Sequence, residues 1–416
     1  MDENRQLDIK LDYIQNNRAI RSSKRYKMSK LCIMVGVHGA SGALSQTFNF
    51  YWNVPTFMCH QYGMFFDDVS SFGIRQNRKD QFRGDEIAIL YDPGAFPALL
   101  KDEYGHTMRR NGGVPQEGNL TYHLEFFRTH VNEQIKDVNF AGLAVIDFES
   151  WRPIFRQNWA SLAPYRDLST EIERARHPFW DKNRIVNEAT RRFEKAGRLF
   201  MEDTLRLART LRPRASWGYY AYPYCYNLTP NVPSADCDPK IYDENNRLSW
   251  MFNLQDVILP SVYLRASLNK RERMELISGR IKEAERISNR SKQNSKKPVL
   301  AYFWYKYQDE PDGFLDDNDL YNGLKMIKNL GGDGIVFWGS SKDFNTKLKC
   351  QEFKDYLTET LGPIVWKFKV GRSPNVDVTT DEEDSSTSIT PITTNTSVKD
   401  VNSEKSTNTK DNIVTE

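Results

Sequence analysis

The feature that most restricts the fold of this 416-residue sequence is a repeated alternation of short apolar segments with longer amphipathic ones. Seven segments have the length and the apolar or aromatic character of buried strands. They are 48–54, 86–91, 142–147, 215–221, 257–263, 299–305 and 334–338. Helical periodicity occupies the intervals at 121–135, 184–211, 270–289, 318–330 and 346–361. Alternation at roughly forty-residue spacing predicts parallel βαβ units.

One helix candidate, 184–211, shows its buried face through a single repeating pattern. Apolar residues recur at steps of three and four, as on one side of a helix. They are Ala189, Phe193, Ala196, Phe200, Leu207 and Leu211. Parallel units can form an open doubly wound sheet or a closed barrel, but no glycine-rich phosphate loop follows the first strand candidate.

A pair of acids marks the end of the third strand candidate. The apolar run 141–146 is followed by Asp147 and Glu149. Since side chains alternate faces along a strand, these two point the same way at its carboxyl end. Two acids on one face cannot both ionise freely, so one pKa is raised. A protonated acid beside an ionised partner is what glycosidic bond cleavage requires, although a bare D-x-E triplet more often carries two solvated acids.

The residues around this pair resemble a known signature. IDFESWRPIFRQNWAS, from Ile146 to Ser161, is similar to the active-site motif of the hyaluronidase family in its insect venom form. Similar blocks occur at 48–63 (FNFYWNVPTFMCHQYG), 91–100 (YDPGAFPALL), 111–121 (NGGVPQEGNLT), 217–230 (WGYYAYPYCYNLTP), 259–264 (LPSVYL), 302–309 (YFWYKYQD) and 337–341 (FWGSS). The resemblance runs in order from about Phe48 to about Phe368, and it is specific because it rests on many blocks.

The resemblance implies an α/β fold, a distorted (β/α) TIM-like barrel of about seven parallel strands. We therefore expect an N-terminal extension at 1–45, one catalytic barrel at 46–370 and a tail at 371–416. The tail is rich in Ser, Thr and acidic residues and has too little apolar surface to offset ordering entropy, so we expect disorder there. Chemistry in such barrels occurs at the carboxyl ends of strands, where Asp147 and Glu149 fall.

The spacing of the two acids leaves open a protein nucleophile, an activated water or substrate assistance. The resemblance implies the third. The N-acetyl carbonyl of the substrate attacks C1, Glu149 protonates the leaving oxygen, and Asp147, held ionised by hydrogen bonds, stabilises the acetamido nitrogen. Water then opens the intermediate with retention, and no metal or cofactor takes part.

The resemblance also implies roles for residues near the reacting sugar. Tyr220 and Tyr263 are expected to donate hydrogen bonds to the acetamido oxygen or to Asp147. Trp338 is expected to form an apolar floor under the sugar. Asp309 is expected to bond that sugar or Tyr263.

Further residues are expected along the substrate groove. Tyr91, Asp92 and Ser341 are expected to line it. Arg152 is expected to meet a uronate carboxylate, since a guanidinium binds carboxylates in a bidentate manner. Taken alone, Arg152 is equally explained by an ion pair with Glu149 or another neighbour.

Four of the five cysteines, Cys59, Cys225, Cys237 and Cys350, lie in the body of the chain, and their spacing matches no zinc site. The resemblance implies the disulfides Cys59–Cys350 and Cys225–Cys237. In the chain-entropy model the long loop is worth on the order of 5 kcal/mol and the short loop roughly 3 kcal/mol. Both bonds imply an oxidising compartment.

The oxidising compartment implied by the disulfides also leads us to expect export and glycosylation. No signal begins at Met1, but Met28 starts a short signal-like segment that ends in small residues near Ser45. We expect a secreted, extracellular protein that carries glycans at sequons. The sequons are Asn119, Asn227, Asn289 and Asn395, of which the second is weakened by Pro230.

Charge and composition restrict the partners. The net charge is +3, and acidic residues concentrate after 372, so the body is mildly basic and compatible with a polyanion. The sequence contains no run of Lys and Arg interleaved with aromatics, the pattern that would predict nucleic acid binding. No stretch approaches the ~20 apolar residues of a membrane span. The histidines form no metal-binding pair, and we expect a monomer that acts on hyaluronan, with chondroitin as a weaker substrate.

Two other functions remain open. A chitinase-type hydrolase also ends a strand in D-x-E, but its longer acidic run is missing because 142–146 contribute no acids. A catalytically inactive, secreted carbohydrate-binding relative would be expected to lose one carboxylate or its supporting aromatics. Here Asp147, Glu149, Tyr220, Tyr263 and Trp338 are all present, which favours an enzyme.

Overall fold

The computed structural model describes residues 47–229, 232–290 and 296–371. All of these residues lie within one compact unit, Ser23–Arg372. The expected N-terminal extension and all but the first residue of the expected tail lie outside the described residues. The division into three regions therefore stays a prediction.

The described chain alternates strands and helices. The strands are β1 (Asn49–Asn53), β2 (Ile87–Tyr91), β3 (Ala98–Lys101), β4 (Thr107–Arg110), β5 (Leu143–Asp147), β6 (Ser216–Tyr219), β7 (Leu300–Trp304), β8 (Lys306–Tyr307), β9 (Glu310–Phe314) and β10 (Gly334–Trp338). The helices are α2 (Leu120–Gln134), α3 (Ala163–Arg176), α4 (Lys182–Leu211), α5 (Pro239–Arg247), α6 (Ser249–Leu254), α7 (Lys270–Asn289), α8 (Asp317–Asn329), α9 (Lys347–Tyr356) and α10 (Gly362–Val370).

Two parallel sheets, β2-β5-β6 and β1-β10-β7, form most of the barrel wall. The segment 257–263 joins them, because Leu259 bridges Tyr220 beside β6 while Ile258 and Ser261 bridge Val299 and Tyr302. This segment was expected to be a strand, and it makes only isolated bridges. Pro260 at its centre has no N–H to donate, which interrupts a continuous ladder.

The other junction, between β1 and β2, is closed by Arg75 and Asn77. The backbone of Arg75 exchanges hydrogen bonds with β1 at Phe50 and Trp52, at 2.8 and 2.9 Å. The side-chain amide of Asn77 exchanges two with the backbone of Ile87 in β2, both at 2.9 Å. The side chain of Asn77 here takes the place of a strand that would join β1 to β2. The ring therefore closes with seven wall segments. The predicted distorted barrel is confirmed.

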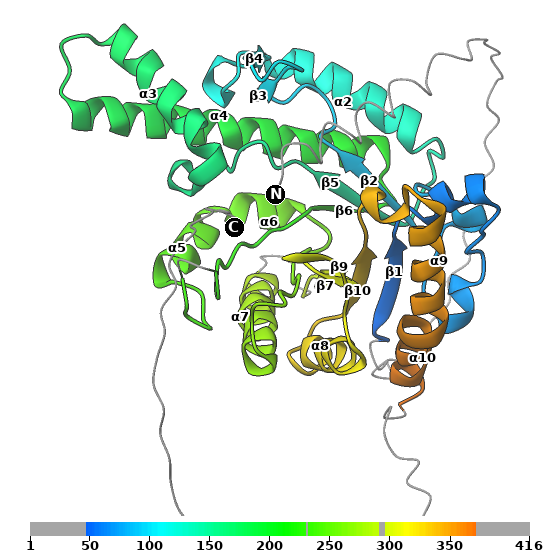
Figure 1. Ribbon diagram of the computed structural model, residues 1–416. Helices are drawn as coiled ribbons and strands as arrows, with labels where there is room; N and C mark the ends of the chain where they lie inside the picture. The colour runs from blue at the N-terminus through cyan, green and yellow to red at the C-terminus, as the bar shows by residue number, and fades with distance from the viewer. Residues whose placement is uncertain (1–46, 230–231, 291–295, 372–416) are drawn as a thin grey trace, which may run out of the picture. The chain divides into compact units, whose positions relative to one another are not determined.

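Helices cover the outside of this ring. Figure 1 shows α2 and α4 over the sheet β2-β5-β6, α7 and α8 beside β7 and β10, and α9 and α10 next to β1. Every residue of β5, β7 and β10 is buried, as expected of parallel strands packed on both faces. None of the described helices is both long enough and apolar enough to span a membrane.

The predicted helices are present, with differences at their ends and faces. In α4, Ala189, Phe193 and Phe200 are buried as expected, but Ala196, Leu207 and Leu211 are half-buried. The buried face instead includes Gly197, Met201, Thr204, Leu205 and Ala208. The predicted helix 346–361 divides into α9 and a π-helical turn, Leu357–Leu361, before α10. Helix α3 and the hairpins β3–β4 and β8–β9 were not expected.

Both expected disulfides are present. Cys59–Cys350 joins residues 291 positions apart, and Cys225–Cys237 joins residues 12 positions apart. Cys59 follows β1, and Cys350 lies in α9, so the first bond connects the two ends of the barrel sequence.

Removing the two disulfides should have unequal effects on stability. Replacing Cys59 and Cys350 with alanine is expected to lower the free energy of unfolding by on the order of 5 kcal/mol. Replacing Cys225 and Cys237 is expected to cost roughly 3 kcal/mol, because a shorter loop is opened in the unfolded chain. Urea unfolding of both double variants beside the native protein measures the difference. A smaller loss from the long-range pair would contradict this account.

The sequons differ in exposure. Asn119 and Asn289 are exposed, and Asn395 lies outside the described residues. Asn227 is fully buried; its amide donates to the carbonyls of Ala235 and Leu276 at 2.8 and 3.1 Å and its oxygen accepts from Arg280. Burial argues against a glycan at Asn227, and the glycans at the four sequons stay predictions.

This difference can be measured in the protein secreted from insect cells. Asn119→Gln is expected to lower the intact mass by one glycan, whereas Asn227→Gln leaves the glycan mass unchanged. The second change instead lowers the free energy of unfolding by about 1–3 kcal/mol, since it disturbs buried hydrogen bonds. A glycan recovered on Asn227 by peptide mass spectrometry would contradict the assignment.

Candidate active site

The carboxyl ends of the barrel strands bring the expected site residues together. Asp147 ends β5 and lies in register with Tyr91, which ends β2. Tyr220 directly follows β6, and Trp338 ends β10. Since parallel strands end at the same edge, residues separated by almost 250 positions become neighbours: the indole nitrogen of Trp338 donates to the hydroxyl of Tyr91 at 3.1 Å.

Asp147 is a buried carboxyl group. Burial raises its pKa well above the usual value, and the negative charges of Glu149 and Asp92 raise it further. Its Oδ1 atom is buried, and no described residue donates a hydrogen bond to it. The expectation that hydrogen bonds hold Asp147 ionised is therefore wrong for the free protein. Asp147 instead keeps an acceptor atom without a partner.

Glu149 lies two residues beyond the strand and is partly exposed. Its charge acts on Asp147 and on the hydroxyl groups of Tyr91, Tyr220 and Tyr263. The two acids therefore form one electrostatic unit, in which the negative charge of Glu149 opposes ionisation of Asp147. The effect on Asp147 agrees with two carboxyl groups that lie close together, and their placement on one face stays a prediction.

An aromatic wall lies beside the acids. The hydroxyl groups of Tyr220 and Tyr263 share a hydrogen bond of 3.0 Å. The Tyr263 ring stacks on Trp338 with ring centres 5.7 Å apart, and Trp304 packs edge-on against Trp338 at 5.4 Å. Burial raises the pKa of Tyr220 and Tyr263 well above the usual range, so both hydroxyls keep their protons at neutral pH and can donate hydrogen bonds.

These groups can supply proton transfer and hydrogen bonding. Two coupled carboxyl groups can hold one proton between them, and the aromatic wall lowers the local polarity. In the described part of the chain, no cluster of three or more histidine, cysteine or acidic side chains could hold a metal ion. The arrangement is that of a glycoside hydrolase with an acid pair.

Comparison with known families supports this chemistry. Residues 40–373 match the model of glycoside hydrolase family 56, described as Hyaluronidase. The chain belongs to the hyaluronidase family. The hyaluronidase of Apis mellifera is 58% identical over 340 residues, which are 80% of this chain and 89% of that one. The hyaluronidase of Vespa magnifica is 54% identical over 319 residues, 77% of this chain and 89% of that one.

A solved structure agrees with the fold. The crystal structure of bee venom hyaluronidase in complex with a hyaluronic acid tetramer is 60% identical in sequence, with a TM-score of 0.75. The match covers 77% of this chain and 99% of that one. Membership of the hyaluronidase family rather than a chitinase family also decides between the two hydrolase classes that the D-x-E pair left open.

Asp92 does not have the surroundings expected of a groove residue in this hyaluronidase. It is buried, and the guanidinium of Arg110 in β4 donates to both of its carboxylate oxygens, at 2.6 and 2.8 Å. Its own N–H donates to the carbonyl oxygen of Asp147 at 2.7 Å. Asp92 therefore lies next to Asp147 and is held by Arg110 of β4.

Arg152 is also buried, at 6% exposure. Its guanidinium lies over the rings of Trp159, Tyr224 and Tyr226, with centroid distances of 4.8 to 5.5 Å, and donates to the carbonyl of Gln157 at 2.9 Å. Stacked aromatics and a backbone carbonyl stabilise such a cation within the fold. These contacts hold the loop after Glu149, and the expected contact of Arg152 with a uronate carboxylate stays a prediction.

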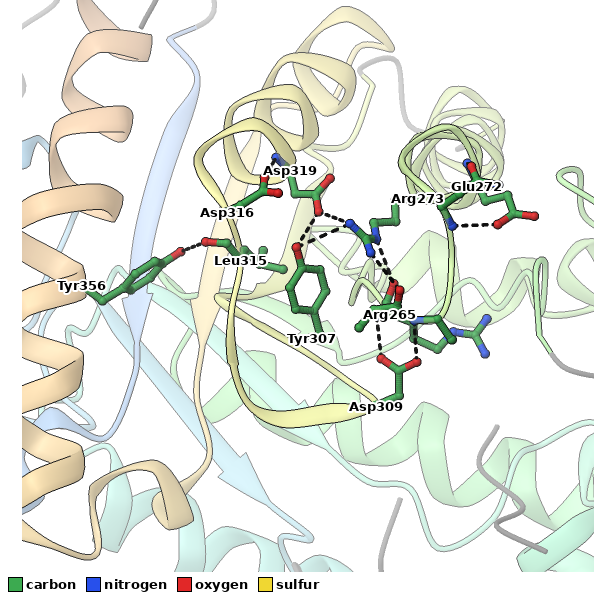
Figure 2. Close-up of polar contacts among 12 residues, drawn as sticks. Arg265, Glu272, Arg273, Tyr307, Asp309, Leu315, Asp316, Asp319 and Tyr356 are labelled. Carbon is green, nitrogen blue, oxygen red and sulfur yellow. Dashed lines mark hydrogen bonds and ion pairs between the residues drawn. The ribbon is translucent and has the colours of Figure 1, made fainter. Parts of the chain in front are cut away.

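Asp309 anchors the loop that follows Tyr263. Its two carboxylate oxygens accept from the N–H groups of Ala266 and Ser267, at 2.6 and 3.1 Å. Figure 2 shows Arg273 on the other side of this loop, where it donates to the carbonyls of Arg265 and Ala266 and pairs with Asp319. The carboxylate of Asp309 therefore supports the backbone of this loop, and its expected bond to Tyr263 or the sugar stays a prediction.

Ser341 begins the short helix that follows Trp338, and it is half-buried. Sequence reasoning missed the residue that holds this turn, Asp343. It accepts from the backbone N–H of Ser340 at 3.1 Å, from the hydroxyl of Tyr305 at 2.8 Å and from Lys306 at 3.2 Å. The role of Asp343 was recognisable from the sequence, because Ser340 and Asp343 form a capping box, which has a characteristic sequence pattern.

Proposed function

We propose that this hyaluronidase cleaves the β-1,4 bonds between N-acetylglucosamine and glucuronate within hyaluronan chains, and chondroitin more slowly. The observation that carries the proposal is the coupled pair Asp147 and Glu149 at the end of β5, beside the hydroxyls of Tyr220 and Tyr263. The bee venom hyaluronidase solved with a hyaluronic acid tetramer, 60% identical, supports the choice of substrate.

The mechanism that fits the site is substrate-assisted and retaining. The acetamido oxygen of the substrate attacks C1 while Glu149 gives its proton to the leaving glycosidic oxygen. The acetamido N–H then acquires positive charge, and the ionised carboxylate of Asp147 accepts that hydrogen and stabilises the charge. Glu149, now ionised, removes a proton from the water that opens the cyclic intermediate, and this step restores both groups.

The aromatic wall has two roles in this scheme. A neutral hydroxyl from Tyr263 or Tyr220 donates to the acetamido oxygen and turns it toward C1. Trp338, already stacked on Tyr263, offers an apolar face to the sugar ring. Because both groups are fixed by contacts within the fold, little ordering is needed when substrate binds.

The proposal is tested by measuring new reducing ends from hyaluronan, chondroitin and chitin with one protein preparation. We expect release from hyaluronan, weaker release from chondroitin and none from chitin. Proton NMR of the first product formed is expected to show the β anomer, as a retaining reaction requires. No release from any of the three polymers would favour an inactive carbohydrate-binding relative instead.

We further propose that the protein is secreted and acts as a monomer outside the cell. The two disulfides support an oxidising compartment. Detection in the culture medium and light scattering of the purified protein test these two points. N-terminal sequencing of the mature chain would show where the extension proposed for 1–45 is cut.

A further inference from the structure

We propose that Arg110 is a positioning residue of the active site, which screens the charge of Asp92 from Asp147 and holds the turn between Asp92 and Phe96. This inference rests on the proposed function, because it concerns when Asp147 becomes ionised during hydrolysis. It assigns a role in the reaction to the hairpin β3–β4, which lies outside the barrel wall.

The contacts of Arg110 define this role. Two of its guanidinium nitrogens donate to the two oxygens of Asp92, and its Nε donates to the carbonyl of Phe96 at 2.8 Å. A bidentate charged pair of this kind is both strong and directional. The side chain of Arg110 is 21% exposed and that of Asp92 is 3% exposed, so solvent screens the interaction only weakly. Arg110 therefore fixes both ends of the turn that follows Tyr91.

The turn is also strained and supported from a second side. Asp92 has a positive φ of 42°, a conformation that few residues other than glycine, asparagine and aspartate adopt readily. Two histidines of α2 accept backbone hydrogen bonds from the turn: His130 from Gly94 at 2.9 Å and His123 from Ala95 at 3.0 Å. Burial lowers the pKa of His123 to about 3, so it stays neutral in this role.

Charged and titratable groups from several elements surround the pair of Arg110 and Asp92. Those near Asp92 and Arg110 are His123, His130 and Tyr122 from α2 and Tyr165 from α3. Those that act on Asp147 or on the tyrosines beside it are Glu149, Asp92, Arg83, Tyr91, Tyr220 and Tyr302. Arg110 is the positive group of this set that contacts Asp92 directly, so its loss removes the bidentate ion pair from the Asp92 carboxylate.

The sign of the effect follows from this arrangement. Asp147 must be ionised to stabilise the acetamido nitrogen, so the acid limb of the activity profile reports the first ionisation of the coupled acids. An unscreened negative charge at Asp92 opposes that ionisation and moves the limb to higher pH. Removal of the Asp92 charge, with Arg110 left in place, moves the limb to lower pH.

The test compares pH profiles of kcat/KM on hyaluronan for Arg110→Met, Asp92→Asn and the double variant. Methionine keeps much of the apolar stem of arginine, and asparagine tolerates positive φ. We expect the acid limb to rise by about one pH unit in Arg110→Met and to fall in Asp92→Asn. In the double variant it is expected to return toward the native position, because neither charge remains.

A matched control is available in Arg286, which donates to both oxygens of Glu283 in a similar bidentate pair. The side chains of that pair are 29% and 0% exposed. Arg286→Met is expected to lose stability without any shift of the acid limb. The inference is overturned if Arg110→Met lowers kcat and the melting temperature with the limb unmoved, or if the double variant keeps the shift.

The Asp92→Asn variant and the native protein each provide an independent result. If Arg110→Met does not fold, the shift to lower pH expected for Asp92→Asn still tests the electrostatic part, and an unmoved limb there overturns it. If the native protein released no reducing ends from hyaluronan, the proposed function itself would fail, which is a different result from an active enzyme with unmoved limbs.

Discussion

Replacing Glu149 with glutamine is expected to lower kcat on hyaluronan by about 10³-fold, within the range measured for loss of a general acid. Glutamine keeps the shape of the side chain and cannot give a proton to the leaving oxygen. Reducing-end release under saturating substrate measures the loss. Because binding does not depend on this proton, the variant should still retain hyaluronan oligosaccharides in a calorimetric titration.

The specificity of that result is checked with a second acid. Glu188 lies on α4 and pairs with Arg191 at the surface, so Glu188→Gln is expected to leave kcat unchanged. If Glu149→Gln kept more than about a tenth of native activity, the proton donor would have been assigned to the wrong residue, since a general acid contributes at least about 10²-fold.

Replacing Asp147 with asparagine is expected to lower kcat by about 10²–10³-fold, because a neutral amide cannot stabilise the charge that develops on the acetamido nitrogen. The loss should appear in kcat more than in KM, since that charge exists only in the transition state and intermediate. An equal loss in binding of uncleaved oligosaccharides would show that Asp147 acts mainly as a ligand for the ground state.

The same variant should be more stable than the native protein at neutral pH. Burial raises the pKa of Asp147 in the folded state, so the folded protein holds this proton more tightly than the unfolded chain does. Stability is therefore lost as pH rises from the unfolded pKa toward the folded one, and asparagine removes that loss. Melting curves of both proteins should converge at low pH and separate as pH increases.

The acid pair was predictable because it depends on one strand. The apolar run identifies β5 and places Asp147 at its carboxyl end, with Glu149 two residues further on, whatever the rest of the chain does. The roles of Asp92, Arg152 and Asp309 depend on partners from β4, the loop after β5 and the loop after Tyr263. Nothing in the local pattern identifies those partners.

The same distinction applies to the fold. The strand candidates on either side of helical stretches were recognisable, since buried parallel strands are continuously apolar. Closure of the ring was not, because it uses the backbone of Arg75 and the side chain of Asn77. Burial of a sequon was equally hidden, since Asn227 looks polar in sequence and is enclosed only by residues from α7 and the neighbouring loop.

The bond between Cys59 and Cys350 has a consequence for survival among proteases. It encloses 291 positions of the sequence, nearly the whole folded body. A single cut in any surface loop between these cysteines leaves two fragments that remain covalently joined and packed in place. Such a nicked molecule would migrate as one species in gel electrophoresis until a reductant is added. It would also keep together the carboxyl ends of the barrel strands, where the candidate active site lies.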